Sequence, residues 1–210
     1  VDGRKAAGSI RLDANERVVI ELENLPAIGM RFLQVQNPGG LFSNDFIFHV
    51  SVDTDLQEAL GTAVRIGDRS VVQEMLAEGA NPNQPVETGN TALSTAAFHG
   101  QLDVMRLLLE KGGKVNATNE DGNTALHVAA FMCRTEIVHL LLAKGASITK
   151  RNGRRERAID TVNGAWSEGL AGFYRTLNAS ATNKVDLEQI QKLRPQLAKL
   201  LRDHAAKQRR

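Results

Sequence analysis

The sequence predicts a mainly α-helical protein in which pairs of helices stack into an elongated array. The nonapeptide GNTALSTAA at residues 89–97 recurs as GNTALHVAA at residues 122–130, 33 positions later. Self-similarity at a fixed period of this size is the signature of repeat architectures. We therefore expect the functional part of the molecule to be a surface rather than an enclosed pocket. The register extends to both sides of the nonapeptide, at Leu76, Leu109 and Leu142 and at Gly79, Gly112 and Gly145.

Residues 1–52 lie outside the repeat and contain segments rich in β-branched and aromatic residues, which favour strands. We expect strands at Val18–Glu23, 31–36 and 45–52, with a turn at the Asn-Pro-Gly-Gly sequence of residues 37–40. A β segment of this size is marginal by itself. It should therefore either end a larger domain or pack on the first helix pair and cover its apolar face.

Each copy of the repeat has the pattern of two short helices followed by an extended connection, which we call a finger. Thr91 and Thr124 open apolar-periodic runs, where each can cap the first helix. The second helix carries an apolar stripe at helical spacing over residues 104–108. Gly112 and Gly145 follow that helix, where a residue with positive φ is wanted. The predicted copies are residues 53–85, 86–118 and 119–151, with a partial copy at 152–162.

These residues resemble the ankyrin repeat family. Residues 121–130 (DGNTALHVAA) and 136–146 (EIVHLLLAKGA) match its pattern nearly throughout, with Ala125 in place of the family's Pro. The resemblance covers residues 53–162. It implies a solenoid of helix pairs that binds partners through its finger tips and the exposed side of the first helix in each pair.

The resemblance also implies roles for three residues. His127 should bond backbone between repeats, and Ser94, at the same place in the preceding copy, should make a weaker link. Cys133 occupies the place of the Gly that ends the first helix of a pair. The alternatives are a catalytic His127 and a reactive thiol at Cys133.

Residues 33–50 (LQVQNPGGLFSNDFIFHV) resemble the closing hairpin of an IPT/TIG-type immunoglobulin-like domain. A complete sandwich of this class needs about seven strands and about 100 residues. Residues 1–52 would therefore hold only part of such a domain.

Residues 163–210 depart from the repeat and are expected to form a helical cap. Residues 164–177 hold the only Trp and the only Tyr of the chain, and apolar-periodic segments follow at 186–193 and 195–204. Pro195 suits a first helical turn, so we expect it to begin a final helix rather than to kink one. The predicted buried set is Leu187, Ile190, Leu193, Leu197, Leu200 and Leu201.

The aromatic residues of the cap allow two interpretations. Trp166, Phe173 and Tyr174 are expected to fill the junction between the cap and the array. Alternatively, Trp166 and Tyr174 form a ligand site, although no other residue near them supports it.

Composition argues against several classes of function. The net charge of +2 is too slight to argue for nucleic acid, and no apolar run approaches the roughly 18 residues that span a bilayer. The single Cys excludes an internal disulfide, and the five His are never paired at metal-ligand spacing. No phosphate-binding loop, nucleophile elbow or paired-carboxylate motif is present. We therefore expect no enzyme activity, no catalytic residue, no cofactor and no metal.

The compartment and the oligomeric state stay open at this stage. The chain begins at Val1 without Met, which we interpret as processing or truncation. A secreted or periplasmic and a cytoplasmic location are both compatible with the sequence.

The resemblance places a partner-binding surface on the finger tips and the first helices. Phe98 and Phe131 are in register, so two aromatic rings should stand one repeat apart on the concave side. Large apolar side chains at such positions are candidates for binding hot spots. Alternatively, each ring folds back on its neighbour, or the molecule's own termini cover the row. The predicted surface comprises Glu87, Thr88, Asn90, Phe98, His99, Glu120, Asp121, Asn123, Phe131 and Met132.

A second candidate surface is the last finger, which is strongly basic. Arg155 replaces its usual turn Gly, and Gly153 comes two positions early, so we expect a finger of altered shape with only Glu156 opposing its positive charge. Such a cluster could attract an anionic polymer or an acidic partner, or it could be a solvated loop. Its cations are Lys150, Arg151, Arg154, Arg155 and Arg157.

Three hypotheses follow. The first is a non-enzymatic module that binds an unidentified protein on the concave face. The second is a structural or targeting appendage of a larger multidomain protein. The third is anionic-polymer binding through residues 150–157, with nucleic acid disfavoured because no aromatic residues are interleaved with the charges.

Overall fold

The computed structural model describes residues 56–208, except 88, 181 and 185, together with four short strands nearer the N-terminus. The chain divides into two compact units, Val1–Thr54 and Asp55–Arg210. This division falls close to the boundary expected after residue 52.

The N-terminal unit contains two pairs of antiparallel strands. β1 (Ala7–Leu12) pairs with β2 (Val18–Glu23), and β3 (Arg31–Leu33) pairs with β4 (Phe46–Phe48). The strand predicted at β2 is confirmed, and β3 and β4 lie inside their predicted segments. β1 was not predicted, because its first residues, Ala and Gly, weaken a strand signal. Most of residues 33–50, which resemble an IPT/TIG hairpin, lie outside the described residues.

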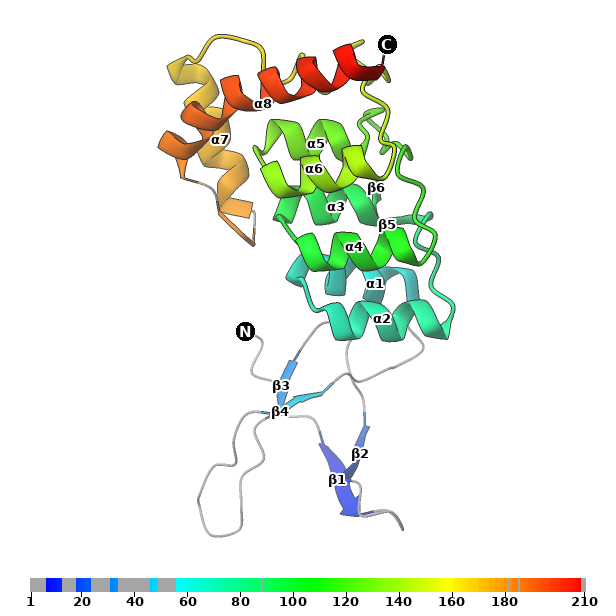
Figure 1. Ribbon diagram of the computed structural model, residues 1–210. Helices are drawn as coiled ribbons and strands as arrows, with labels where there is room; N and C mark the ends of the chain where they lie inside the picture. The colour runs from blue at the N-terminus through cyan, green and yellow to red at the C-terminus, as the bar shows by residue number, and fades with distance from the viewer. Residues whose placement is uncertain are drawn as a thin grey trace. The chain divides into compact units, whose positions relative to one another are not determined.

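The C-terminal unit begins with three helix pairs stacked in chain order (Figure 1). α1, α3 and α5 pack side by side, as do α2, α4 and α6. The mainly helical repeat architecture with a small antiparallel β segment is therefore confirmed. The pairs are α1 (Leu56–Ile66) with α2 (Arg69–Glu78), α3 (Ala92–His99) with α4 (Leu102–Glu110), and α5 (Ala125–Phe131) with α6 (Thr135–Ala143). The first finger ends in a short β ribbon of β5 (Pro85–Glu87) and β6 (Asn90–Thr91).

The core runs through the whole stack because each copy buries the same positions. Leu60, Leu93 and Leu126 recur at intervals of 33 and are all buried. The Ala pairs at 96–97 and 129–130 are completely buried as well, and their small side chains let neighbouring helices approach closely. Burial of one Leu side chain contributes roughly 1.5–3 kcal/mol. The array is therefore stabilised by contacts between copies as much as within them.

The turn inside each helix pair contains a residue with positive φ. These residues are Gly67, Gly100 and Cys133. A Cβ on Gly67 would lie 2.2 Å from the side chain of Gln101, and one on Gly100 would lie 2.9 Å from the guanidinium of Arg134. Gln101 and Arg134 belong to the following copy, and their long side chains could move aside, so the positive φ is what favours glycine at these two turns. Cys133 precedes the cap rather than another copy, and its side chain is buried there.

The third finger has the same shape as the second, so the expected change in shape is wrong. The N–H of Gly122 donates to Asn119 O at 2.9 Å, and the N–H of Arg155 donates to Asn152 O at the same distance. Arg155 also adopts the positive φ of Gly122, 63° against 75°. A Cβ on Gly122 would lie 2.7 Å from the N atom of Gly153 in the next finger. No further finger follows Arg155, so its side chain has room.

His127 joins α5 to the third finger, as the resemblance implied. Nδ1 accepts the N–H of Thr124 at 3.3 Å, so Nε2 carries the proton and donates it to Glu156 O at 3.0 Å. Burial lowers the pKa of His127, which keeps the ring neutral. Ser94 holds the same position in α3, but its hydrogen bonds within the described residues go to Thr91 of its own copy. The weaker link expected at Ser94 is therefore confirmed.

The cap consists of α7 (Glu168–Ser180) and α8 (Leu187–Gln208), and α8 crosses the end of the stack (Figure 1). Pro195 lies inside α8, so the expectation that it begins a helix is wrong. Ile190, Leu197 and Leu201 are buried at helical spacing on both sides of Pro195. A continuous helix places all three on one face, and this burial offsets the loss of one backbone hydrogen bond.

The junction between array and cap is filled by stacked aromatic rings. Tyr174 is fully buried, with its ring 4.8 Å from that of Phe131 and 5.9 Å from that of Trp166. The expected role of Tyr174 is confirmed. Phe173 is instead 52% exposed, because consecutive residues of a helix point about 100° apart and cannot both face the junction.

Arg155→Gly should raise the free energy of unfolding by about 0.5–1 kcal/mol. A residue with a side chain loses roughly 1–2 kcal/mol of stability at positive φ. Glycine avoids this cost, but its greater loss of backbone entropy on folding cancels about 0.5–1 kcal/mol of the gain. Urea unfolding followed by the fluorescence of Trp166 measures the effect. The matched change Gly122→Ala should lower stability, because its Cβ meets the next finger. A loss of stability in Arg155→Gly would contradict this account.

His127→Ser, which copies the residue at position 94, should lower the free energy of unfolding at pH 7 by about 1–2 kcal/mol, through loss of the bond between copies. The same urea experiment serves. His139→Ser is the control, because His139 is exposed on α6 and should change stability by less than about 0.5 kcal/mol. Equal effects of the two substitutions would rule out a bridging role for His127.

Candidate binding groove

A groove of about 1170 Å³ runs along the inner side of the array. Residues of α3, α5 and the fingers form one wall, and α7 with the residues before it forms the other. α7 takes this position because the chain turns back after the third finger and runs beside the array (Figure 1). The groove is therefore built jointly by repeated and non-repeated residues.

The apolar part of the groove brings together three helices. The ring of Phe173 lies 5.8 Å from that of Phe131 in an edge-to-face arrangement. Phe173 is the only large hydrophobic residue that is exposed among those described. An exposed aromatic ring in a concave surface is a candidate hot spot. The apolar lining includes Phe98, Val128, Phe131, Leu170, Phe173 and Leu177.

The polar part of the groove is a row of Asn side chains on the fingers. Asn119 Nδ2 donates to Asn90 Oδ1 at 3.2 Å, and Asn152 Nδ2 donates to Asn123 Oδ1 at 2.9 Å. Each bond joins one finger to the next. The row therefore keeps the finger tips in fixed positions relative to one another.

Three charged side chains of the fingers remain uncompensated at this groove. Glu120, Asp121 and Arg154 are exposed and line it. Among the described residues, none of these three side chains makes a hydrogen bond or an ion pair. They are available to contact a partner.

The end of the groove nearest α8 is closed by a polar cluster around Tyr174. Arg194, which is 5% exposed, donates to Tyr174 Oη at 2.8 Å and to Thr161 O at 3.1 Å. Tyr174 Oη donates in turn to Phe131 O at 2.6 Å. Burial raises the pKa of Tyr174 to about 12, so the phenol keeps its proton. This cluster attaches α7 to the last turn of α5.

The far end of α7 is tied to the array by Thr182 and Asn183, which we call the strap. The N–H of Thr182 donates to Nδ1 of His99 at 3.0 Å, and its hydroxyl donates to Arg65 O at 2.9 Å. The N–H of Asn183 donates to His99 O at 3.3 Å. Carbonyls at helix C-termini lack partners inside their own helix, so the strap supplies donors to the ends of α1 and α3.

Arg134 completes the attachment of the strap. Its Nη2 donates to Phe98 O at 3.2 Å and also to Asn183 O. Arg134 belongs to the third copy, whereas Arg65 and His99 belong to the first and second. The two strap residues thus contact all three copies.

His99 is neutral in this arrangement. Burial lowers its pKa to about 4, with further contributions from the positive charges of Arg65 and Arg134. An acceptor Nδ1 requires the neutral ring, which agrees with the N–H donated by Thr182.

Most of the predicted surface residues line the groove, but not all of them are exposed. Met132 and His99 are buried, 1% and 6% exposed, so the prediction that they lie on the exposed side of the first helices is wrong. Each directly follows a Phe of the groove and borders the groove as well, but the helical turn of about 100° leaves its side chain almost fully covered. Phe131 is partly covered by α7, as one of the alternatives anticipated. Glu87 lies in β5, and Thr88 lies outside the described residues.

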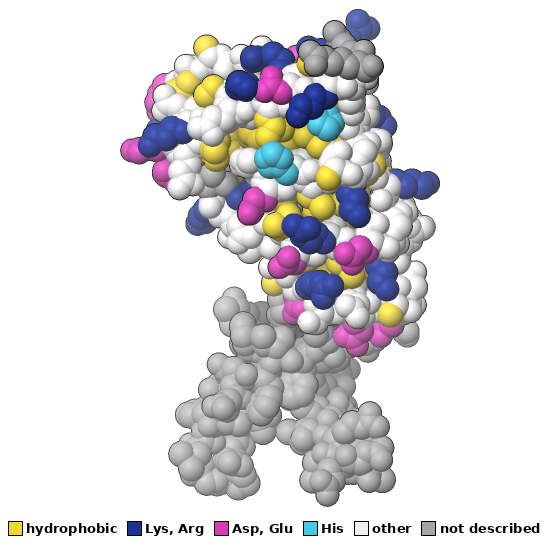
Figure 2. Space-filling model, viewed as in Figure 1, with side chains coloured by type: hydrophobic (Ala, Val, Ile, Leu, Met, Phe, Trp, Pro, Cys, Tyr) yellow, Lys and Arg dark blue, Asp and Glu magenta, His cyan; other side chains and the backbone are white. Residues whose placement is uncertain are grey.

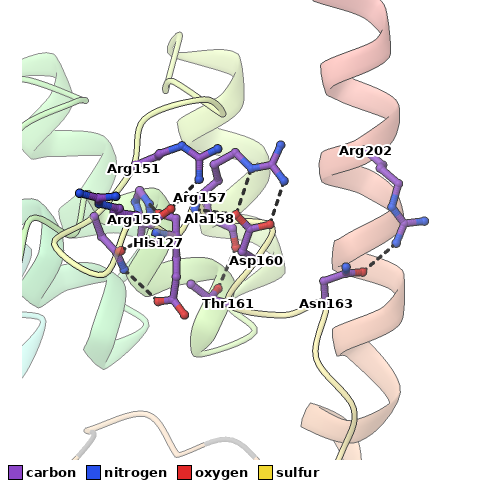
Figure 3. Close-up of polar contacts among 11 residues, drawn as sticks. His127, Arg151, Arg155, Arg157, Ala158, Asp160, Thr161, Asn163 and Arg202 are labelled. Atoms are coloured by element: carbon purple, nitrogen blue, oxygen red, sulfur yellow. Dashed lines mark hydrogen bonds and ion pairs between the residues drawn. The ribbon is translucent and has the colours of Figure 1, made fainter.

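The basic finger is less positive than its sequence suggests. Arg157 forms a two-point ion pair with Asp160, with N–O distances of 2.9 and 3.0 Å (Figure 3). This pair lowers the pKa of Asp160. Lys150 donates to Asn116 O, and Arg151 donates to Arg155 O. Glu156 was predicted to be the only opposing charge, but Asp160 opposes the finger's positive charge as well.

A smaller groove of about 610 Å³ lies between α6 and α8. Figure 2 shows apolar side chains in this region, bordered by basic and histidine side chains. Leu142 and Leu200 form its floor, and Lys199 is paired with Asp203 at 2.7 Å. It is unrelated to the predicted surface.

Sequence reasoning misses several residues that build the main groove. Phe173 and Arg194 carry weak signals, since Phe173 adjoins an aromatic that fills the junction and Arg194 falls within an apolar helical stripe. Thr182 and Asn183 carry none, because a short polar connection between helices has no preferred partner. Their role depends on where the chain returns.

The described part of the chain gives no support for a metal site, a membrane span or a reactive thiol. It contains no group of His, Cys, Asp or Glu residues arranged to hold a metal ion. Nor does any of its helices have the length and apolar character needed to cross a membrane. Cys133 is buried, and burial raises its thiol pKa to about 11, which argues against a reactive thiolate.

Comparison with known proteins identifies the array. A family model described as ankyrin repeats (3 copies) matches residues 60–152. No curated protein sequence matches the chain, and the resemblance of residues 33–50 to an IPT/TIG domain is not confirmed. Ankyrin repeats generally serve as protein–protein interaction modules and are typically not enzymes. The three stacked helix pairs and their fingers are therefore an ankyrin repeat array.

Proposed function

We propose that the ankyrin array binds a segment of a partner protein in the groove between its concave face and α7. The observation that carries this proposal is Phe173, which packs edge-to-face on Phe131 at the groove and is still half-exposed. Exposing a large apolar ring costs free energy in water. A partner that covers it regains that free energy on binding.

The polar wall of the groove favours a specific rather than a purely apolar contact. The Asn row is bonded from finger to finger, and the side chains of Glu120, Asp121 and Arg154 have no partner among the described residues. Polar groups around an apolar centre give an interface its register and selectivity. The partner should therefore present apolar side chains toward α5 and α7 and polar groups toward the fingers.

The two alternative functions receive less support. Binding of an anionic polymer would use the basic finger, but Arg157 is already paired and Lys150 and Arg151 donate to carbonyls. A purely structural appendage makes no use of the groove or of the exposed Phe173. No observation specifically favours either one.

The test uses a photo-crosslinking amino acid at position 173 in the full chain, with the same residue at position 176 as the matched control. Thr176 is exposed on α7 but does not line the groove. We expect a partner to crosslink at 173 and not at 176. For that partner, Phe173→Asp should weaken binding at least tenfold, because a charge replaces the apolar contact, whereas Thr176→Asp should change it less than twofold.

Equal binding of the partner to both Asp variants would overturn the groove as the site. Loss of binding on Arg154→Glu/Arg155→Glu, combined with a steep dependence on salt, would favour the basic finger instead. The fluorescence of Trp166 verifies that each variant is folded.

A further inference from the structure

α7 is attached to the rest of the molecule at two separate points. Of its residues whose side chains are described, only Ala171 and Tyr174 are buried. Tyr174 anchors the helix to α5 and α8 through Phe131 and Arg194. Beyond that anchor, the strap holds the other end. Between the two points the helix covers the groove with Leu170, Phe173 and Leu177.

One ring nitrogen is the only titratable acceptor among the hydrogen bonds of the strap within the described residues. Nδ1 of His99 accepts the N–H of Thr182 at 3.0 Å and is also 3.0 Å from the Thr182 hydroxyl. A protonated imidazole carries a hydrogen on Nδ1 and cannot accept the N–H. The other strap donors bond to the carbonyls of Arg65, His99 and Gly100 and to the side-chain oxygen of Gln101. Asn183 O in turn accepts from Arg134, whose charge would be repelled by a protonated His99 beside it.

We propose that α7 is a gate over the concave groove and that His99 is its latch, so that protonation of His99 releases the strap and opens the groove. This inference rests on the proposed function for its biological meaning, because it describes how access to that same groove is regulated. The gate turns about the Tyr174 anchor, which stays in place. Opening exposes Phe98 and the apolar side of α7 to a partner.

The charges around His99 set the direction of the response. Arg65 on α1 and Arg134 at the start of α6 both face it, and no carboxylate acts on it among the described residues. A protonated His99 therefore meets only positive charges while it stays buried. Movement into water relieves both the repulsion and the desolvation.

The sign of the pH dependence follows from linkage. In the closed state the pKa of His99 is about 4, and a released His in water has a pKa of about 6.5. The open state therefore binds more protons, and it gains population as the pH falls from about 6.5 toward 4. Between pH 7.5 and pH 5 the ratio of open to closed molecules should rise about 30-fold.

The experiment measures the gate directly, without any partner. Spin labels on Ala179→Cys and Arg106→Cys join the exposed end of α7 to the exposed face of α4. The native Cys133 needs no replacement, since it is buried and its thiol pKa is raised to about 11. We expect one narrow distance distribution at pH 7.5 and a second, longer population at pH 5.

Two variants and a control separate the latch from general acid effects. His99→Gln offers an amide oxygen as acceptor and cannot titrate, so the distances should stay short at both pH values. His99→Phe offers no acceptor, so the longer population should appear already at pH 7.5. His139→Gln, on the outer face of α6, should behave as the wild type. Far-UV circular dichroism checks that the array stays folded at pH 5, because His127 is also buried and neutral.

The possible outcomes are distinct. A wild-type chain that is folded but keeps only the short distance at pH 5, or His99→Gln that opens as the wild type does, would overturn the gate. Absence of any partner at position 173 would overturn the proposed function and leave the distance measurement unaffected. A gate that fails this test leaves the groove as a permanently open binding site.

Discussion

The close contact between one repeat and the next is the constraint on which the rest of this structure depends. No helix pair can bury its apolar faces alone, so neighbouring copies must approach until side chains meet backbone. Gly122 shows how narrow the tolerance is, because a Cβ there would lie 2.7 Å from the backbone N of Gly153 in the following finger. The 33-residue spacing therefore recurs because each copy must fit against the next in the same way. His127 adds a hydrogen bond to the same contact.

The constraint disappears where the array ends, and the residues change accordingly. Cys133 and Arg155 occupy positions with positive φ that earlier copies give to glycine. Both retain the backbone conformation, although no fourth copy lies over them. The last helix pair still needs a cover for its apolar face, and α8 supplies it with Ile190, Leu197 and Leu201. The groove forms because the chain runs along the inner side of the array as α7 before α8 crosses its end.

The repeated array could be predicted from the sequence more completely than the non-repeated cap. The array was predictable because the same residue types recur at the same positions every 33 residues, so that the pattern in one copy supports the interpretation of the other. The cap was only partly predictable. The local preference of Pro195 for a helix start lost to the burial of one apolar face on both sides of it. β1 was missed because pairing with β2, and not its own composition, holds it in place.

The candidate site was the hardest part to predict, because adjacent residues in it have opposite roles. Phe98 faces the groove, while His99 is buried and receives the strap. Phe131 lines the groove and Met132 does not reach the surface. Register in a repeat shows which positions are equivalent, but it does not show what a non-repeated segment later places over them. Since Thr182 and Asn183 lie more than 80 residues after His99 along the chain, only the three-dimensional path could connect them. In the proposed mode of binding, a partner is therefore selected jointly by residues that break the repeat, such as Phe173, and by polar residues that the repeat places on the fingers.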